Sequence, residues 1–213
     1  MKEKQNIFIV GARWDGHPRV VFDSIINNED FSVSGFIDDN EKYHGNTYDG
    51  IPVLGGFEKL EYLKEKNILN FIIATGDGKF RTVKGAKLET DGFKPINVLD
   101  RRSIISKSAE LGKGISICAN AVIAPGATLD DFVLINHSAT IDHNVILEKG
   151  VTISPGVNIG GRAIIKENTF IGLGAIILPD IVIGKNCIIG AGAVVIRDAP
   201  DNSKAVGNPA RFI

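Results

Sequence analysis

Two histidines, His137 and His143, are the residues of this sequence best suited to acid–base chemistry at neutral pH. The pKa of an unperturbed imidazole is about 6.5, so an accessible histidine can accept and release a proton. His143 is flanked by Asp142 and Asn144, either of which could orient its ring. A lone histidine is often only a turn residue, so the prediction depends on what lies around it.

A pair of glycines, Gly160 and Gly161, follows His143, and Gly161 stands 18 residues after it. A backbone without a side chain can approach a reacting group closely and donate its N–H to an oxyanion. A general base and an oxyanion donor would then meet at one site, provided that the fold brings these two positions together.

Three polar loops in the first hundred residues could together form a nucleotide pocket. The first opens a helix, where backbone N–H groups can bind phosphate, but its glycine spacing is not GxGxxG and it is a weak signal alone. The second ends a strand with carboxylates, the usual place for contacts to a ribose or a base. The candidates are Gly11, Gly16 and His17 in the first loop, Asp38 and Asp39 in the second, and Gly76, Asp77 and Arg81 in the third.

The second half of the chain has a six-residue period. From Ile105 to Val195 an aliphatic residue recurs at every sixth position, sixteen times in succession. Neither a helix nor a hairpin sheet predicts this spacing, whereas a solenoid does. Three hexapeptides close one triangular coil, so residues 18 apart stack on successive coils. Gly161 is therefore expected one coil from His143, with His137 one face away.

The first half has a different pattern, in which apolar strands alternate with amphipathic helices. This pattern predicts a Rossmann-like α/β domain with a short parallel sheet over residues 1–102, followed by a β-helix over residues 103–213. Ligands bind beyond the carboxyl ends of such strands, where the three loops lie. Strands are expected at 7–10, 33–37, 71–74 and 96–99, and helices at 19–26, 57–66 and 79–88.

The composition is that of an ordinary globular protein. With 24 basic and 25 acidic residues interspersed along the chain, it predicts no binding to nucleic acid or to an anionic membrane. The start lacks the apolar stretch of a signal peptide, and no segment approaches bilayer length, so we expect a cytoplasmic protein without membrane insertion. Cys118 and Cys187 lie inside regular repeats, which argues against a disulfide or a thiolate metal site.

Several motifs resemble the sugar O- and N-acetyltransferases of the NeuD and PglD type, which are hexapeptide-repeat acyltransferases. The resemblance covers nearly the whole chain, and the last of these motifs is highly typical of the hexapeptide enzymes. The motifs are GHPRVV at 16–21, GFIDD at 35–39, GIPVLG at 50–55, IDH at 141–143, ISPG at 153–156 and GNPAR at 207–211.

The resemblance implies a left-handed parallel β-helix that forms a homotrimer, with acetyl-CoA in the groove between subunits and a nucleotide-linked sugar on the N-terminal domain. It makes His143 the general base, Gly161 the oxyanion donor and Asn136 a substrate-positioning residue, with no metal. Relatives usually carry an acidic residue at position 144, so either Asp142 substitutes for it or the base is weaker. The coenzyme would contact Thr152, Gly161, Leu173, Ala191, Gly207, Asn208, Pro209 and Arg211.

The leading hypothesis is therefore acetyl-CoA-dependent N-acetylation of a nucleotide-linked amino sugar, a 4-amino-4,6-dideoxyhexose used in surface polysaccharide biosynthesis. O-acetylation of sialic acid is an alternative, because only the sugar pocket separates the two activities. A zinc lyase of the γ-carbonic anhydrase kind needs three histidines, and the repeats contain two. A non-catalytic nucleotide-sugar-binding scaffold stays open because of Asn144.

Overall fold

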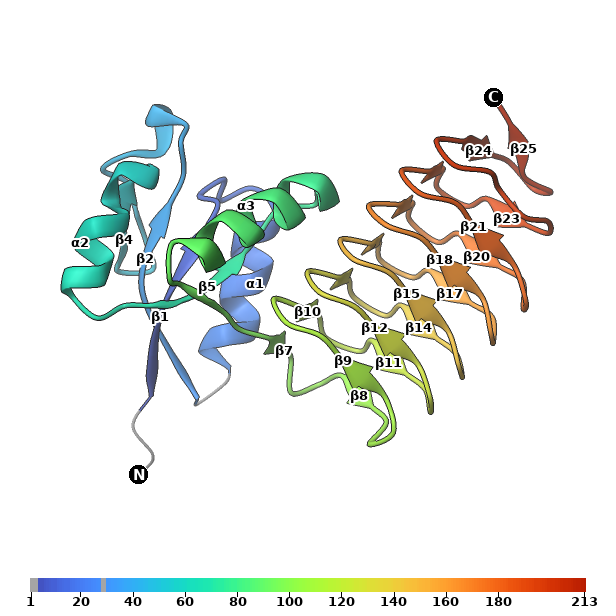
Figure 1. The fold of residues 1–213 in the computed structure, drawn as a ribbon, viewed down its shortest axis with the longest axis horizontal. Helices are drawn as coiled ribbons and strands as arrows, with labels where there is room; N and C mark the ends of the chain where they lie inside the picture. Colours follow the sequence, from blue (N-terminus) through green and yellow to red (C-terminus); the bar gives the residue numbers. More distant parts are fainter. Residues whose placement is uncertain (1–3, 28–29) are drawn as a thin grey trace.

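The computed structural model describes residues 4–27 and 30–213. It consists of an α/β domain followed by a stack of triangular β-coils (Figure 1). The α/β domain has one sheet in the order β3-β4-β2-β1-β5-β6, in which all neighbours are parallel except β3 and β4. Its strands are β1 (Gln5–Val10), β2 (Phe31–Ile37), β3 (Thr47–Tyr48), β4 (Ile51–Gly55), β5 (Asn70–Ile73) and β6 (Lys94–Pro95).

Helices cover both faces of this sheet. Alternate residues of β1 point to opposite sides: Ile7 packs in one apolar cluster with α1 (His17–Ile26), and Phe8 packs in another with α2 (Leu60–Glu65) and α3 (Gly78–Thr90). Short 3₁₀ turns at Glu41–Tyr43 and Phe57–Lys59 complete the domain. The helices lie close to the predicted positions, whereas β3 and β4 were not predicted as strands.

The chain enters the β-helix directly from the α/β sheet. The strand expected at 96–99 is divided, because β6 belongs to the α/β sheet while β7 (Val98–Leu99) pairs with β10 of the first coils. Val98 also packs in the cluster beneath α1, so the chain passes into the β-helix without a linker. The domain boundary between residues 102 and 103 stays a prediction.

The β-helix consists of two-residue strands in three parallel sheets, and each pairing within the repeats joins residues 18 apart, as in Val122 with Thr140. The hairpin of β24 (Lys204–Val206) and β25 (Arg211–Phe212) ends it. The intervening strands are β8 (Ile104–Ile105), β9 (Glu110–Leu111), β10 (Ser116–Ile117), β11 (Val122–Ile123), β12 (Thr128–Leu129), β13 (Leu134–Ile135), β14 (Thr140–Ile141), β15 (Ile146–Leu147), β16 (Thr152–Ile153), β17 (Asn158–Ile159), β18 (Ile164–Ile165), β19 (Phe170–Ile171), β20 (Ile176–Ile177), β21 (Val182–Ile183), β22 (Ile188–Ile189) and β23 (Val194–Val195).

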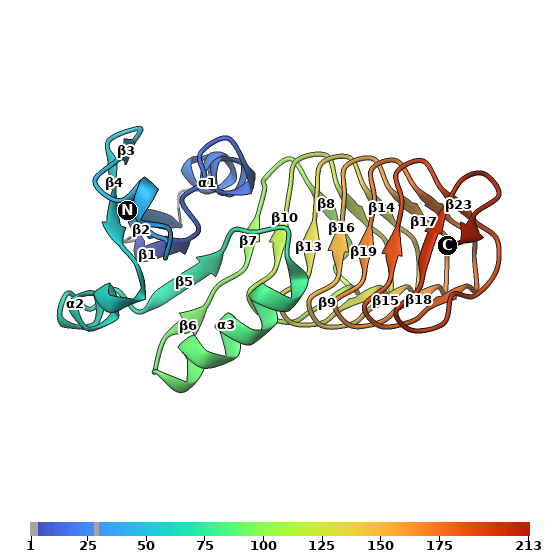
Figure 2. The same ribbon diagram turned by 90° about the horizontal axis from the view of Figure 1, so that it is seen from above.

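The second residue of each strand points into the coil, and these residues form a continuous apolar core that includes Ile117, Ile135 and Ile153. Each aliphatic side chain is covered by the coils on either side, so several coils must stack for the β-helix to be stable. Figure 2 shows α3 lying against the first coils of this stack. The α/β domain and the β-helix therefore share an interface rather than a flexible joint.

Candidate active site

His143 lies in the turn after β14, and its ring is oriented by the next residue. Its Nδ1 is 3.1 Å from Oδ1 of Asn144. An amide oxygen only accepts, so this contact places the ring proton on Nδ1 and leaves Nε2 as the basic atom. Asp142 has a different partner, since its Oδ1 accepts a hydrogen bond from the backbone N–H of His143 at 2.7 Å. Asn144 therefore orients the ring, and Asp142 shapes the turn.

Gly161 lies beside the basic atom of His143, as the spacing of 18 predicts. A methyl group at Gly161 would lie 2.5 Å from Nε2 of His143, so glycine is the residue that lets the ring stay in place. Within the described chain the N–H of Gly161 has no backbone partner. A base and a free N–H donor are thus adjacent on one edge of the β-helix.

A charged pair borders this edge one coil further on. Arg162 donates two hydrogen bonds to Asp180, at 2.6 and 2.7 Å. These bonds lower the pKa of Asp180 and raise that of Arg162, so both groups remain charged at neutral pH. The pair neutralises itself and leaves little net field beside His143.

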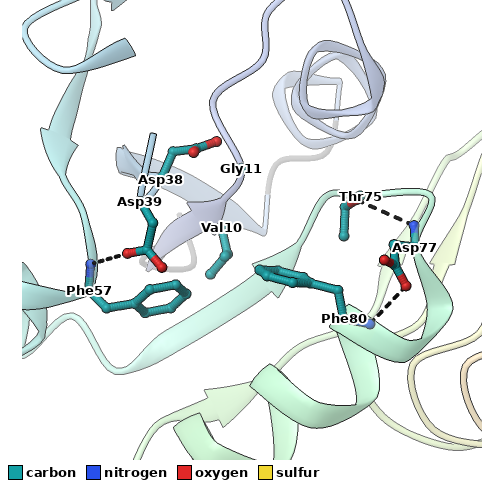
Figure 3. Close-up of a pocket in the computed structure, with 8 residues that line it drawn as sticks. All are labelled: Val10, Gly11, Asp38, Asp39, Phe57, Thr75, Asp77 and Phe80. Atoms are coloured by element: carbon teal, nitrogen blue, oxygen red, sulfur yellow. Dashed lines mark hydrogen bonds between the residues drawn. The ribbon is translucent and has the colours of Figure 1, made fainter. Parts of the chain in front are cut away.

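One cavity of the α/β domain has a volume of about 220 Å³ and lies at the carboxyl ends of β1, β2 and β5, where nucleotides bind in parallel sheets. Figure 3 shows two phenyl rings, those of Phe57 and Phe80, facing each other across it. The lining residues are Val10, Gly11, Asp38, Asp39, Phe57, Thr75, Asp77 and Phe80.

The two neighbouring carboxylates of this cavity have different tasks. Both oxygens of Asp38 accept backbone hydrogen bonds, from Ala12 at 2.8 Å and from Asn40 at 2.9 Å, so Asp38 braces the first loop. Asp39 is more exposed, with a long bond from the N–H of Phe57 (3.3 Å) and an ion pair with Lys84 (3.7 Å). Asp39 is therefore the carboxylate with free capacity for a ligand.

Phe57 and Phe80 were missed from the sequence, although a signal exists. Each stands at the start of a helical turn directly after a glycine-containing loop at the sheet edge. Asp77 caps α3 by accepting a hydrogen bond from the N–H of Phe80 at 3.0 Å, which fixes where that ring lies. The ammonium of Lys84 lies 3.9 Å from the centre of the Phe57 ring and fixes the opposite wall.

A second cavity of about 420 Å³ lies between α1 and the β-helix, and His137 borders it. Gly16, the N-cap of α1, lines it with Trp14 and Arg19. Nε2 of His17 lies buried nearby with no hydrogen-bond partner in the described chain. Burial, followed by the charges of Arg81 and His137, lowers the pKa of His17 to about 4.

Arg81 and Thr152, predicted to contact substrate and coenzyme, lie at the junction of the two domains. Both are buried between the α/β domain and the β-helix. Arg81 donates to the carbonyl oxygens of Thr75, Phe132 and Gly150, among others, and to Oγ1 of Thr152 at 2.9 Å. Burial lowers the pKa of Arg81 to about 10, so it is still charged at neutral pH. These two side chains join the halves of the molecule and do not line the cavities above.

The other predicted coenzyme positions divide between two edges of the β-helix. Leu173 and Ala191 stand at multiples of 18 from His137 and share its edge, whereas Gly161 shares the edge of His143.

Asn136 is at the His137 edge, where its Oδ1 accepts from the N–H of His137 at 2.9 Å. The segment Gly207, Asn208, Pro209 and Arg211 lies at the far end, where Gly207 O accepts from Val194 N–H at 3.0 Å.

Within residues 4–27 and 30–213, no three His, Cys, Asp or Glu side chains are grouped so that they could hold a metal ion. None of the helices described is long and apolar enough to cross a bilayer.

Comparison with known proteins identifies the class. Residues 6–87 match the PglD N-terminal domain, and residues 162–197 match the bacterial transferase hexapeptide repeats. No curated protein matches the chain significantly. The combination defines an acyltransferase with a left-handed β-helix, and the predicted fold class is confirmed.

Two solved structures place the chain more narrowly. One is a mutant GDP-perosamine N-acetyltransferase from Caulobacter crescentus in complex with CoA and GDP-perosamine, 30% identical over 98% of this chain and 96% of that chain, with a TM-score of 0.93. The other is the acetyltransferase domain of PglB from Neisseria gonorrhoeae FA1090, 30% identical over 99% and 100%, with a TM-score of 0.90. The chain belongs to the NeuD/PglD-type sugar N-acetyltransferases.

Proposed function

We propose that this protein transfers the acetyl group of acetyl-CoA to the amino group of a nucleotide-linked 4-amino-4,6-dideoxyhexose in surface polysaccharide biosynthesis. The observation that carries the proposal is the position of Gly161 beside Nε2 of His143. The complexes of the relatives with CoA, acetyl-CoA and GDP-perosamine support this class of substrates.

The reaction proceeds directly, without a covalent enzyme intermediate. As the sugar amine attacks the thioester carbonyl, Nε2 of His143 takes its proton. The N–H of Gly161 donates to the oxyanion of the tetrahedral intermediate, which then collapses as the C–S bond breaks. The leaving thiolate recovers the proton from the imidazolium. Asn144 keeps the second ring proton on Nδ1 throughout.

The nucleotide occupies the cavity of the α/β domain. Its base fits between the rings of Phe57 and Phe80, and the carboxylate of Asp39 can accept a hydrogen bond from the base edge or the ribose. Base stacking on aromatic side chains is favourable for any base, so these rings hold the nucleotide without selecting it. Gly16, the N-cap of α1, lines the second cavity together with His137 of the β-helix, and the N-terminus of this helix suits the diphosphate.

We propose further that the protein works as a homotrimer in the cytoplasm, where acetyl-CoA and nucleotide sugars are available. The distribution of residues supports this: the cavity beside α1 borders the edge of His137, while His143 and Gly161 lie on the next edge of the coil. A second copy would bring its His143 edge to the first copy's nucleotide. Coenzyme positions Leu173 and Gly161, on different edges of one chain, would then face the same groove.

Thiol release from acetyl-CoA tests the activity, with UDP-, dTDP- and GDP-linked amino sugars and free sialic acid as acceptors. Release with a nucleotide-linked amino sugar is expected. Release with sialic acid alone would replace the proposal by O-acetylation, and tight nucleotide-sugar binding without release would indicate a scaffold.

Mixed oligomers test the shared site. His143→Ala subunits are co-expressed with subunits carrying Phe57→Ala and Phe80→Ala, and the mixture should recover activity that neither variant has alone. A mixture as inactive as its components would mean that each chain works by itself.

A further inference from the structure

The buried polar side chains gather where the α/β domain meets the β-helix. Seven polar or charged side chains are buried in the described part of the chain, and four of them, Ser24, Arg81, Asp100 and Thr152, lie at this junction. A buried polar group costs stability unless it is bonded. Their concentration therefore marks a place where a defined geometry, rather than apolar packing alone, holds the two halves.

Arg81 is the centre of this junction. Its Nε donates to Phe132 O at 2.9 Å, and its Nη2 donates to Gly150 O at 3.0 Å and to Val151 O at 3.1 Å, all on the β-helix. On the other side its Nη1 donates to Thr75 O at 2.8 Å. Thr75 lines the nucleotide cavity, so one side chain connects the cavity wall to the coils.

Thr152 makes a second connection to the same wall. Its hydroxyl accepts from Nη2 of Arg81 at 2.9 Å and donates to the carbonyl of Gly76 at 3.1 Å. Thr152 is the outward-facing residue of β16, and it pairs with Leu134 of β13, two residues before Asn136. The loop 75–77 of the nucleotide cavity is thereby held at a fixed distance from the edge that carries Asn136 and His137.

Helix α3 packs so closely against the β-helix that neither can shift relative to the other. A side chain at Gly78, at the start of α3, would collide with the carbonyl of Gly150, and a side chain at Gly85 would collide with the ring of Phe132. Because α3 lies directly on the coils, a change in the bonds of Arg81 or Thr152 must move the loop 75–77 or leave a buried group unpaired.

We propose that Arg81 and Thr152 are positioning residues: they fasten the wall of the nucleotide cavity to the β-helix and so align the bound nucleotide with the transfer edge. The proposal deepens the function above and rests on the nucleotide occupying this cavity. Neither residue touches the substrate. Their effect passes through Thr75 and Gly76, whose carbonyl groups they hold.

Thr152→Val tests this, since it keeps the shape of the side chain and removes the hydroxyl. The affinity for UDP, GDP and dTDP is measured by calorimetry, so the test does not depend on turnover. The affinity for the preferred nucleotide should fall about three- to tenfold, the span that one hydrogen bond gives. The KM for acetyl-CoA should stay unchanged.

Two further variants separate positioning from a general loss of stability. Thr152→Ser, which retains the hydroxyl, should recover most of the lost affinity. Thr82→Val is the matched control, because it removes a hydroxyl at the same interface that has no hydrogen bond to the loop 75–77. The Thr82 hydroxyl lies 3.0 Å from the carbonyl oxygen of Lys79 and 3.3 Å from Oδ1 of Asn168 on the β-helix. The proposal is overturned if Thr82→Val weakens the nucleotide as much as Thr152→Val, or if Thr152→Ser fails to restore it. Absence of acetyl transfer in the wild type, with nucleotide binding intact, would instead count against the proposed function.

Discussion

The Nδ1 atom of His143 lies 3.1 Å from the side-chain oxygen of Asn144, so an amide stands where the family resemblance leads us to expect an acidic partner of the base. The amide fixes the tautomer as a carboxylate would, but it supplies no negative charge to the imidazolium that forms during transfer.

Asn144→Asp is accordingly expected to raise kcat several-fold, because a carboxylate stabilises the protonated ring in the transition state. Asn144→Ala should lower kcat, since the ring loses its orientation. Steady-state thiol release measures both. A lower kcat in Asn144→Asp would mean that the amide has a specific task that a charge disturbs.

His143→Ala should reduce kcat by about two to four orders of magnitude, the usual contribution of a general base. The side chain lies in a turn on the edge of the β-helix and its loss creates no core cavity, so the oligomer should keep its size by light scattering. An unchanged kcat would place the base elsewhere.

Gly161→Ala should lower kcat by up to about 100-fold, the cost of displacing a catalytic group by about 1 Å. The added methyl would meet the ring of His143 at 2.5 Å and push it away from the reacting amine. Its melting temperature should change little, because the ring can turn outward.

Gly160→Ala provides the contrast on the same coil. Its methyl group would lie 2.7 Å from the backbone nitrogen of Pro179. Because the backbone cannot move away easily, the melting temperature of this variant should fall. Equal losses of stability in the two variants would refute the specific role of the contact between Gly161 and His143.

The β-helix could be predicted closely because a single six-residue period of the sequence determines its structure. Residues 18 apart in the sequence are hydrogen-bonded neighbours in the structure, as Thr140 and Asn158 are, so the adjacency of His143 and Gly161 follows from counting. The α/β strands were also predictable where they are buried on both faces, as in β1 and β5, since such strands are continuous apolar runs. The short β3 and β4, partly exposed at the sheet edge, lack that signal.

The junction could not be predicted, because it depends on contacts between distant parts of the chain. Arg81 follows a polar loop at the sheet edge, where a ligand contact and a contact with another domain look alike in sequence. Thr152 stands at the outward position of its hexapeptide, which is ordinarily exposed, and it is buried only because α3 covers it. Asp100 lies at the same junction, where its Oδ2 accepts a hydrogen bond from the hydroxyl of Ser24 in α1 at 3.0 Å.

Phe57→Leu should weaken nucleotide binding about five- to 100-fold, the range for loss of one aromatic stacking contact. Calorimetry with UDP, GDP and dTDP measures it. Tyr62→Leu is the matched control, because this ring is 44% exposed on α2 and does not line the cavity. If both substitutions leave the affinity unchanged, the base binds outside the two phenyl rings.

His17 should make the stability of the protein depend on pH. Burial and the neighbouring Arg81 and His137 lower its pKa from about 6.5 to about 4 in the folded state, so between these values only the unfolded chain takes up the proton. The contribution is therefore constant above pH 6.5 and is lost progressively as the pH falls toward 4. The melting temperature of wild type should fall more steeply than that of His17→Gln across this window. Parallel curves would show that folding does not lower the pKa of His17.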